Sequence, residues 1–283
     1  MKRTIMLRGM GLIAGGIGLI SLAVPAAKAA EPNDNLNATL WMQTSAEYAG
    51  VTMGAYQLAT VMLDKALADP NWTALPGEQG ENYAGKPPAV ILDVDETVLD
   101  NSKYQAWMVV NGKTFDPKTW DAFVKSVDSI PIPGSLEFTK YADSKGVKVF
   151  YVTNRTDDQE DATRENLKKF GYPMGGNVDT VLMQKEKPEW ATSKKSPRRI
   201  FVGADYRVLL VLGDNFGDFV DGYKGTIAER RALMDQQKAM WGTKWIVLPN
   251  PSYGSWESAA FGHDFKDPDQ RGKKLGAFSV WAQ

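Results

Sequence analysis

The segment AVILDVDETVLDN, residues 89–101, carries the clearest structural signal in this 283-residue chain. Its first four residues are apolar, and Asp93 and Asp95 follow almost at once. A short continuous apolar run is typical of a buried strand in a parallel sheet. Side chains two residues apart in an extended segment point to the same face, so the two carboxylates need a cation or a shared proton to relieve their repulsion. A hard divalent ion such as Mg2+ meets that need.

Four further apolar runs follow this first strand, and helical segments alternate with them. The runs span residues 147–152, 178–183, 208–212 and 245–248. The helical candidates span residues 135–144, 158–170 and 226–240, and one long helix, with a possible break near Gly50 or Gly54, is expected over residues 36–68. This alternation predicts an α/β fold with a doubly wound, Rossmann-like parallel sheet of about five strands and an N-terminal helix.

The segment after the first strand, about residues 102–134, is longer than the few residues that usually join a strand to a helix. It contains Trp107, Trp120 and Phe123, and a turn signal at Asn111-Gly112. Ligands of such sheets bind at the carboxyl ends of the strands. We therefore expect the segment to form a small cap over an active site, as part of the same domain.

A second acidic strand end follows the run at 208–212, where Asp214 and Asp218 stand next to Gly213 and Gly217. Glycine permits the tight turns that such a strand end needs. Mg2+ usually takes one or two carboxylates together with substrate phosphate oxygens and water, so Asp93 and Asp214 fit its demands. Asp218 is expected to orient a metal-bound water from behind the direct ligands.

Polar groups suited to phosphoryl oxygens end the second predicted strand, in Thr153, Asn154 and Arg155. A cation is still needed near the carboxylates and the phosphate, and Lys195 is our choice because a lysine there neutralises their mutual repulsion. The sequence alone leaves its neighbours open as alternatives: Lys194, Arg198 and Arg199.

The N-terminus has the pattern of a secretory signal peptide. Three cations, Lys2, Arg3 and Arg8, come before or within the start of a glycine-rich apolar stretch that ends at Pro25, and the small residues that follow offer a cleavage site after Ala29. The apolar run is shorter than the ~20 residues of a spanning helix. We expect residues 1–29 to be removed, leaving a single domain over residues 30–283 that is exported to a periplasm or the medium.

Composition excludes several classes of protein. The chain has 33 basic and 34 acidic residues, and without residues 1–29 its net charge is about −5, so nothing favours a nucleic acid polymer as partner. It has no cysteine, which excludes disulfides, thiolate metal sites and a lipid-bearing cysteine. One histidine, His263, cannot supply a two-histidine phosphatase mechanism or a multi-histidine zinc site. We expect a soluble protein without a membrane anchor, and a homo-oligomer is possible.

The order of these elements resembles the haloacid dehalogenase (HAD) superfamily of phosphohydrolases, whose first motif is DxDx[TV] and whose fourth is GDxxxD. Residues 93–97 and 213–218 match these motifs. Within the superfamily the chain is similar to the class C acid phosphatases. The longer strings that carry this likeness are WMQTSAEY (41–48), DVDETVLDNS (93–102), VTNR (152–155), GDNFGDF (213–219) and LPNPSYGSWE (248–257).

The resemblance implies a role for each matching residue. Asp93 would attack phosphorus to form an aspartyl phosphate, and Asp95 would protonate the leaving oxygen and then activate water. One Mg2+ per active site would be bound by Asp93, the backbone carbonyl of Asp95 and Asp214. Thr153 and Lys195 would hold the phosphoryl group.

The same resemblance suggests 5′-nucleotides among the substrates, with the base stacked on aromatic side chains. Tyr253 is the first candidate for that contact, and Trp120 and Tyr56 are weaker ones. Glu47 and Tyr48 are expected to tie the long helix to the core. Family members typified by lipoproteins carry a cysteine at the cleavage site, and this chain departs from them in having none.

The sequence therefore predicts an exported, Mg2+-dependent acid phosphatase that hydrolyses small phosphate monoesters. A phosphotransferase on the same scaffold remains an alternative, whereas a dehalogenase is disfavoured because Asp95 supplies the acid and base that ester cleavage needs. A non-catalytic exported nucleotide-binding protein is the alternative from another class. Turnover of a phosphate ester separates the enzyme from the binding protein.

Overall fold

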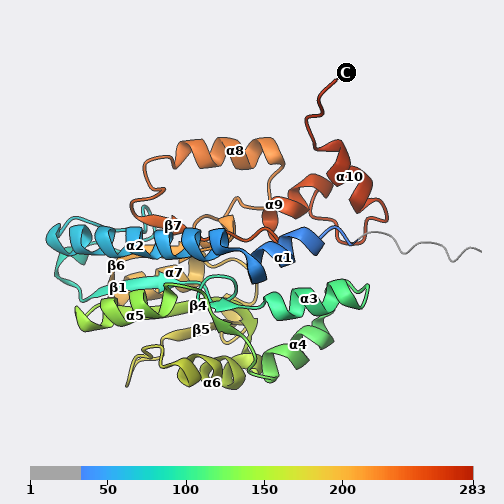
Figure 1. Cartoon of the computed structure of the whole chain (residues 1–283). Coiled ribbons are helices and arrows are strands. Elements are labelled where there is room, and N and C mark those ends of the chain that lie inside the picture. The colour runs from blue at the N-terminus through green and yellow to red at the C-terminus, as the bar shows by residue number, and fades with distance from the viewer. Residues whose placement is uncertain (1–32, 283) are drawn as a thin grey trace, which may run out of the picture. The chain divides into compact units, whose positions relative to one another are not determined.

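The computed structural model describes residues 33–282, in which a parallel sheet carries helices on both faces (Figure 1). The strands are β1 (Pro88–Leu92), β4 (Lys148–Thr156), β5 (Val181–Gln184), β6 (Arg207–Gly213) and β7 (Trp245–Val247). Their order is β5-β4-β1-β6-β7, and every neighbouring pair is parallel. The predicted α/β fold with five parallel strands is confirmed. The predicted signal peptide, residues 1–29, lies outside the described residues.

Alternate residues of each central strand pack into two separate cores. In β1, Val90 and Leu92 face one core, and Ala89 and Ile91 face the other, as the period of two in a strand requires. Because all four side chains are at most 2% exposed, the strand is apolar along its whole length and not alternating. This explains why a continuous apolar run marks it in the sequence.

The first core is covered by α2 (Ala46–Ala68), α5 (Ser135–Ser144) and α6 (Glu160–Phe170). The second is covered by α7 (Ser196–Asp205) and by the short helix η3 (Pro188–Trp190). The helix α7 was not predicted, because its apolar residues are consecutive, at 200–202, and do not recur at helical spacing. Ile200 and Phe201 are 49% and 41% exposed, and Val202 alone of the three is buried.

The long N-terminal helix is interrupted, but at a different place from the two glycines named above. It consists of α1 (Leu36–Thr44) and α2, separated at Ser45. Ser45 is extended, with ψ of 137°, and its side chain accepts a hydrogen bond from the backbone N–H of Tyr48, which caps α2. Gly50 and Gly54 lie inside α2 with open space beside them.

The insertion after β1 forms two helices, α3 (Ser102–Val110) and α4 (Pro117–Lys125). A small antiparallel pair, β2 (Leu99–Asp100) and β3 (Ile130–Pro131), closes it at its base. The strand pair brings the two ends of the insertion together, so α3 and α4 project as one unit (Figure 1). Asp116 caps the start of α4, because its side chain accepts from the N–H groups of Lys118 and Thr119.

The remaining helices are peripheral to the sheet. They are η1 (Tyr83–Gly85), η2 (Asp157–Gln159), η4 (Phe216–Asp218), α8 (Ile227–Gln236), α9 (Ser255–Ser258), η5 (Ala259–Phe261) and α10 (Gln270–Gly276). The predicted helix over 158–170 begins as η2 before α6, and the one over 226–240 ends four residues early as α8. Across residues 33–282, no helix is both long and apolar enough to span a membrane.

The core between α2 and the sheet predicts a large difference between two leucines of one helix. Leu63 is fully buried, and Leu58 is 38% exposed. We expect Leu63→Ala to lower the free energy of unfolding by about 2–5 kcal/mol, because it leaves a cavity in a packed core. Leu58→Ala, the matched control, should cost less than about 1 kcal/mol. Urea unfolding of both variants checks this, and equal losses would show that α2 does not rest on the sheet through Leu63.

Candidate active site

The carboxyl ends of three neighbouring strands bring the predicted polar residues together. Asp93 directly follows β1, Asp214 directly follows β6, and Thr153 lies near the end of β4. The backbone N–H of Asp93 donates to the carbonyl of Leu212 at 3.0 Å, which fixes the start of the loop against β6. The site therefore occupies the sheet edge at which α/β folds bind ligands.

Lys195 lies between two carboxylates at the centre of this edge. Its Nζ is 2.5 Å from Asp93 Oδ1 and 2.7 Å from Asp218 Oδ1, and all three side chains are at most 10% exposed. The second oxygen of Asp218 accepts from the backbone N–H of Asn215 at 2.8 Å. Asp218 is thus held by one donor on each oxygen. Lys195 is thus the cation that pairs with both Asp93 and Asp218.

Asp214 completes a group of three carboxylates that fits a metal ion. Ligand oxygens of Asp93, Asp214 and Asp218 all lie within 4.8 Å of one another. Asp214 Oδ2 accepts from Asn250 Nδ2 at 2.8 Å, whereas its Oδ1 has only a long contact of 3.4 Å from the hydroxyl of Thr97. Both oxygens of Asp218 have a close donor. Among the described residues, Asp93 Oδ2 has no hydrogen-bond donor and Asp214 Oδ1 has only the long contact, so these two oxygens keep lone pairs that a hard cation such as Mg2+ takes.

The crowding of buried carboxylates raises their proton affinity. Burial, together with the charges of Asp218 and Asp95 and against the lowering effect of Lys195, raises the pKa of Asp93 to about 7. Burial, with the charges of Asp218 and Asp93, holds the pKa of Asp214 well above its ordinary value. Burial lowers the pKa of Lys195, but Asp218 and Asp93 outweigh it, and the net shift is upward. One lysine leaves this site with excess negative charge, which a divalent cation would balance.

Asp95 is bound through a single oxygen. Arg155 Nε donates to Asp95 Oδ1 at 2.9 Å, Arg155 NH2 is 2.8 Å from the same oxygen, and Asn101 Nδ2 donates to it at 2.9 Å. The remaining guanidinium nitrogen, NH1, donates to the hydroxyl of Thr163 at 3.1 Å. The contacts of Arg155 among the described residues are with protein groups, and its predicted role in binding substrate stays a prediction.

Thr153 and Asn154 are fixed by a cation that the sequence had left as an alternative. Arg198, which is fully buried, donates to the backbone carbonyl of Thr153 and, at 2.6 Å, to Asn154 Oδ1. Asn154 Nδ2 donates to the carbonyl of Ser193 at 3.1 Å. These bonds join the end of β4 to the segment that carries Lys195. Arg198 therefore supports the loop, while Lys195 faces the carboxylates.

Glu96, inside the first motif, is a buried carboxyl group that sequence reasoning did not single out. It is fully buried, and its backbone is left-handed, with φ of 52°. Its side chain accepts from Asn101 N at 2.8 Å and from the hydroxyl of Tyr253. Burial, followed by the charge of Asp95, raises its pKa to about 8. A non-glycine residue in this conformation is held by its surroundings, and such strain concentrates at functional sites.

The aromatic candidates lie in different settings. Tyr253 is half-buried, with its hydroxyl on Glu96, and the ring of Trp120 lies 5.6 Å from the guanidinium carbon of Arg155. Tyr56 is in the core, and its hydroxyl donates to the carbonyl of Thr97 at 2.6 Å. Tyr48 is also in the core, and Glu47 is exposed. The hydroxyl of Tyr56 thus connects the core to the backbone of the first motif.

Three polar residues of the site were missed, although each stands in a quoted string. They are Glu96, Asn101 and Asn250. Nothing in their local pattern marks them, because their partners come from distant segments: Tyr253 for Glu96, Arg155 for Asn101 and Asp214 for Asn250. The ring of His263 contacts Ser258 and the carbonyl of Gly225.

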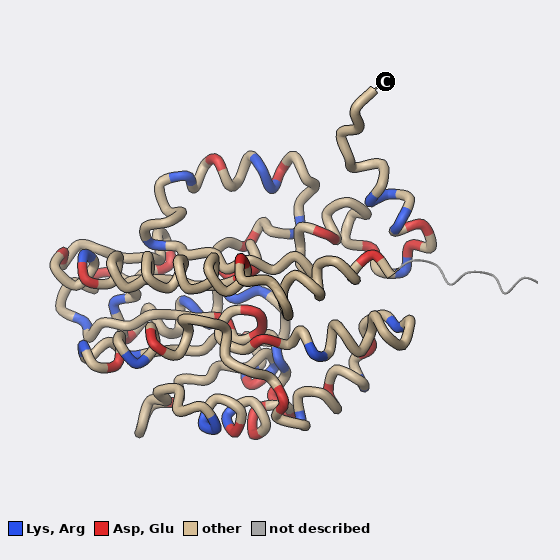
Figure 2. Tube along the Cα trace, viewed as in Figure 1, with Lys and Arg blue, Asp and Glu red and all other residues tan. Residues whose placement is uncertain are grey.

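Charge elsewhere is mixed. Acidic and basic segments are interspersed along the outer helices, including α6 and α8 (Figure 2).

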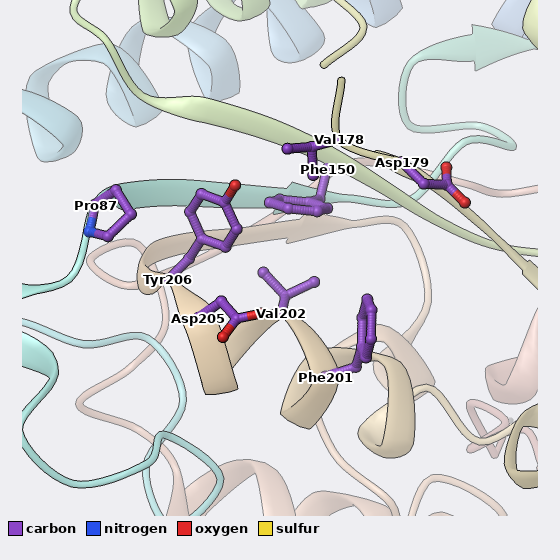
Figure 3. A pocket seen from close by; sticks show the side chains of 8 residues that line it. All are labelled: Pro87, Phe150, Val178, Asp179, Phe201, Val202, Asp205 and Tyr206. Atoms are coloured by element: carbon purple, nitrogen blue, oxygen red, sulfur yellow. The ribbon is translucent and has the colours of Figure 1, made fainter. Parts of the chain in front are cut away.

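A cavity of about 410 Å³ lies on the α7 face, lined by residues such as Phe150, Phe201 and Tyr206 (Figure 3). Pro87 and Tyr206 directly precede β1 and β6, so the cavity lies at the amino ends of the strands. The three carboxylates of the candidate site, Asp93, Asp214 and Asp218, lie at the opposite edge of the sheet and do not line this cavity.

Comparison with known proteins agrees with the fold. Residues 21–256 match the family described as HAD superfamily, subfamily IIIB (Acid phosphatase). The class C acid phosphatase from Bacillus anthracis has a similar structure, with a TM-score of 0.76 and 34% identity, and the match covers 88% of this chain and 98% of that one. A second structure of that enzyme, with tungstate bound, gives a TM-score of 0.77 with the same identity and coverage.

More distant curated relatives are plant proteins. The stem 28 kDa glycoprotein of Glycine max is 25% identical over 166 residues, 58% of each chain. Acid phosphatase 1 of Solanum lycopersicum is 28% identical over 131 residues, 46% of this chain and 51% of that protein. The chain spans about half the length of the curated relatives it matches. It belongs to subfamily IIIB of the HAD superfamily, the acid phosphatases, which are phosphomonoesterases.

Glu96 predicts a pH dependence of stability. Its folded pKa, about 8, lies above the ordinary value of 4.5, so the folded chain binds this proton more tightly than the unfolded chain. The resulting stability is present below the ordinary value and is lost as the pH rises through the folded value. With a chelator present, the wild-type chain should lose more free energy of unfolding between about pH 5 and about pH 8 than Glu96→Gln does. Equal losses in urea unfolding would contradict the assignment.

Proposed function

We propose that this chain is an exported, Mg2+-dependent acid phosphatase that hydrolyses small phosphate monoesters, 5′-nucleotides among them, through an aspartyl phosphate on Asp93. The observation that carries the proposal is the grouping of Asp93, Asp214 and Asp218 within 4.8 Å, with Lys195 at 2.5 Å from the nucleophile. Phosphoryl transfer depends mainly on positioning and on neutralising charge, and this grouping provides for both.

Asp93, the backbone carbonyl of Asp95 and Asp214 would hold the Mg2+. The bonds that occupy both oxygens of Asp218 support this choice, because they leave Asp218 in its pairing with Lys195. When bound, Mg2+ would neutralise charge on the phosphate and the carboxylates as the transition state forms. The chain's own part is to keep the two carboxylates fixed at adjacent strand ends, β1 and β6.

In the first step, an oxygen of Asp93 attacks phosphorus and the ester P–O bond breaks. The leaving oxygen takes its proton from Asp95, so the alcohol departs neutral and Asp95 is left as a carboxylate. Lys195 orients Asp93 and favours its ionised form, because its ammonium group lies 2.5 Å from one carboxylate oxygen, and the bound cation would favour that form further. Burial alone would favour protonation of Asp93, which would remove the nucleophile.

In the second step, Asp95 takes a proton from a water molecule, which attacks phosphorus and breaks the bond to Asp93. Inorganic phosphate leaves, and both aspartates return to their first state. Thr153 and Lys195 are proposed to hold the phosphoryl oxygens throughout. Tungstate, an oxyanion with the same tetrahedral shape as phosphate, is bound in one structure of the Bacillus anthracis enzyme, which supports an oxyanion site in this family.

The insertion over residues 102–134 is proposed to act as a cap that contacts the leaving group. Trp120 of α4 supports this, because its ring lies next to Arg155, which in turn binds Asp95. Tyr253 reaches the first motif through its hydroxyl, which bonds to Glu96. Aromatic faces at both positions suit a nucleobase. Export through a cleaved signal peptide over residues 1–29 rests on the sequence pattern alone.

Removing the nucleophile tests the mechanism. Asp93→Asn keeps the size of the side chain but cannot form the acyl phosphate, so phosphate release from p-nitrophenyl phosphate and nucleoside monophosphates at acidic pH should fall by at least about a thousandfold. Circular dichroism should show an intact fold. Wild-type activity in this variant would show that Asp93 is not the nucleophile. Adding an alcohol acceptor to the wild-type assay separates hydrolysis from phosphotransfer, by the yield of phosphorylated alcohol.

Metal dependence tests the cation site. A chelator should abolish phosphate release and Mg2+ should restore it. Asp214→Asn should raise the Mg2+ concentration for half-maximal activity by at least about tenfold, because a charged ligand is lost. Asp235→Asn on α8, an exposed residue outside the site, is the matched control and should leave this concentration unchanged. Full activity of the chelated wild type would contradict a metal requirement.

A further inference from the structure

The buried guanidinium of Arg155 is committed to protein groups at every nitrogen. Nε donates to Asp95, NH1 to Thr163, and NH2 to Asn101 Oδ1 at 3.3 Å, while also lying 2.8 Å from Asp95. The side chain has no exposed surface. Within residues 33–282, Asp95 is the carboxylate that pairs with it. A buried, permanently charged group of this kind is held by the partner that neutralises it.

The donors that reach the side chain of Asp95 all end on the same oxygen. Two nitrogens of Arg155 and one of Asn101 lie within 2.9 Å of Oδ1, and the hydrogen bonds of the described chain place no donor on Oδ2. An oxygen that faces three N–H donors has no acceptor to which it could direct a proton of its own. A proton on Asp95 is therefore confined to Oδ2.

Asn101 is fixed as firmly as the group it holds. Its Oδ1 accepts from Ser129 Oγ at 2.6 Å and from Arg155, and its Nδ2 donates to both Asp95 and Glu96. This pattern of donors and acceptors allows only one orientation of the amide. Asn101 directly precedes α3 and Ser129 directly precedes β3, so the same network joins the two ends of the insertion to Asp95.

We infer that Arg155 and Asn101 are positioning residues for Asp95: they hold Oδ1 so that Oδ2 alone delivers the proton to the leaving group. The inference rests on the function proposed above. Under this inference, Arg155 acts by contacting the proton donor, Asp95, and does not bind the phosphate. A proton donor acts only when it is correctly placed. Loss of its positioning should therefore slow ester cleavage most when the leaving group needs a proton.

Two substrates with different leaving groups test this. The p-nitrophenolate ion departs without a proton, whereas the alkoxide of glycerol phosphate or of a nucleoside monophosphate needs one. Arg155→Met should lower kcat/KM for the alkyl esters by about a hundredfold, and for p-nitrophenyl phosphate by less than about fivefold. Asn101→Ala should shift the ratio in the same direction. If Arg155→Met does not fold, as thermal unfolding would reveal, Asn101→Ala carries the test.

The Asp95→Asn background shows whether Arg155 acts through Asp95. If it does, adding Arg155→Met to Asp95→Asn should change kcat/KM by less than about twofold, because the group that it positions is already lost. Arg207→Met is the matched control. Arg207 is a buried arginine and the first residue of β6, at the opposite end of the strand from Asp214, and it donates to the carbonyl of Asp69. Its loss should affect both substrates equally.

An equal loss for both kinds of ester in Arg155→Met, or full additivity with Asp95→Asn, would overturn the inference and leave Arg155 as a structural or phosphate-binding residue. Either result leaves the phosphatase function intact. Failure of the proposed function looks different, since the wild-type chain would then release no phosphate from either substrate.

Discussion

The contact on which the site depends is the one between Lys195 and two buried carboxylates, Asp93 at 2.5 Å and Asp218 at 2.7 Å. Three carboxylates gather at this edge of the sheet within 4.8 Å, and burial penalises each charge. A single lysine cannot neutralise them all, and the excess negative charge is what a divalent cation would balance. This excess charge would link the fold to the proposed metal binding and to the proposed nucleophile, Asp93, which must stay ionised.

The rest of the structure keeps these charges in register. The register of β1 with β4 and β6 fixes where Asp93 lies relative to the ends of these neighbouring strands. The backbone N–H of Asp93 also donates to the carbonyl of Leu212. From α2, the Tyr56 hydroxyl holds the carbonyl of Thr97. From the C-terminal segment, Tyr253 and Asn250 reach Glu96 and Asp214. Elements far apart in the sequence therefore fix the two acidic loops that follow β1 and β6.

Much of this could be predicted from the sequence, because the signals are local. Apolar runs that end in Asp93 or Asp214 mark buried strands and their functional edge at once, and the resemblance on the longer strings supplied the family. What could not be predicted depends on distant pairing. Arg155 and Asn101 are 54 residues apart, and Arg198 and Thr153 are 45 apart. The break lies at Ser45 and not at a glycine, because Ser45 is extended and its side chain caps the start of α2.

The central claim is that phosphate passes through Asp93, and trapping the intermediate tests it most directly. Asp95→Asn should slow the attack of water on the aspartyl phosphate, whereas p-nitrophenyl phosphate can still phosphorylate Asp93 because its leaving group needs no proton. Acid quenching of this variant during turnover, followed by peptide mass spectrometry, should find one phosphoryl group on Asp93. Turnover by this variant with Asp93 unmodified and no phosphorylated peptide would contradict the account.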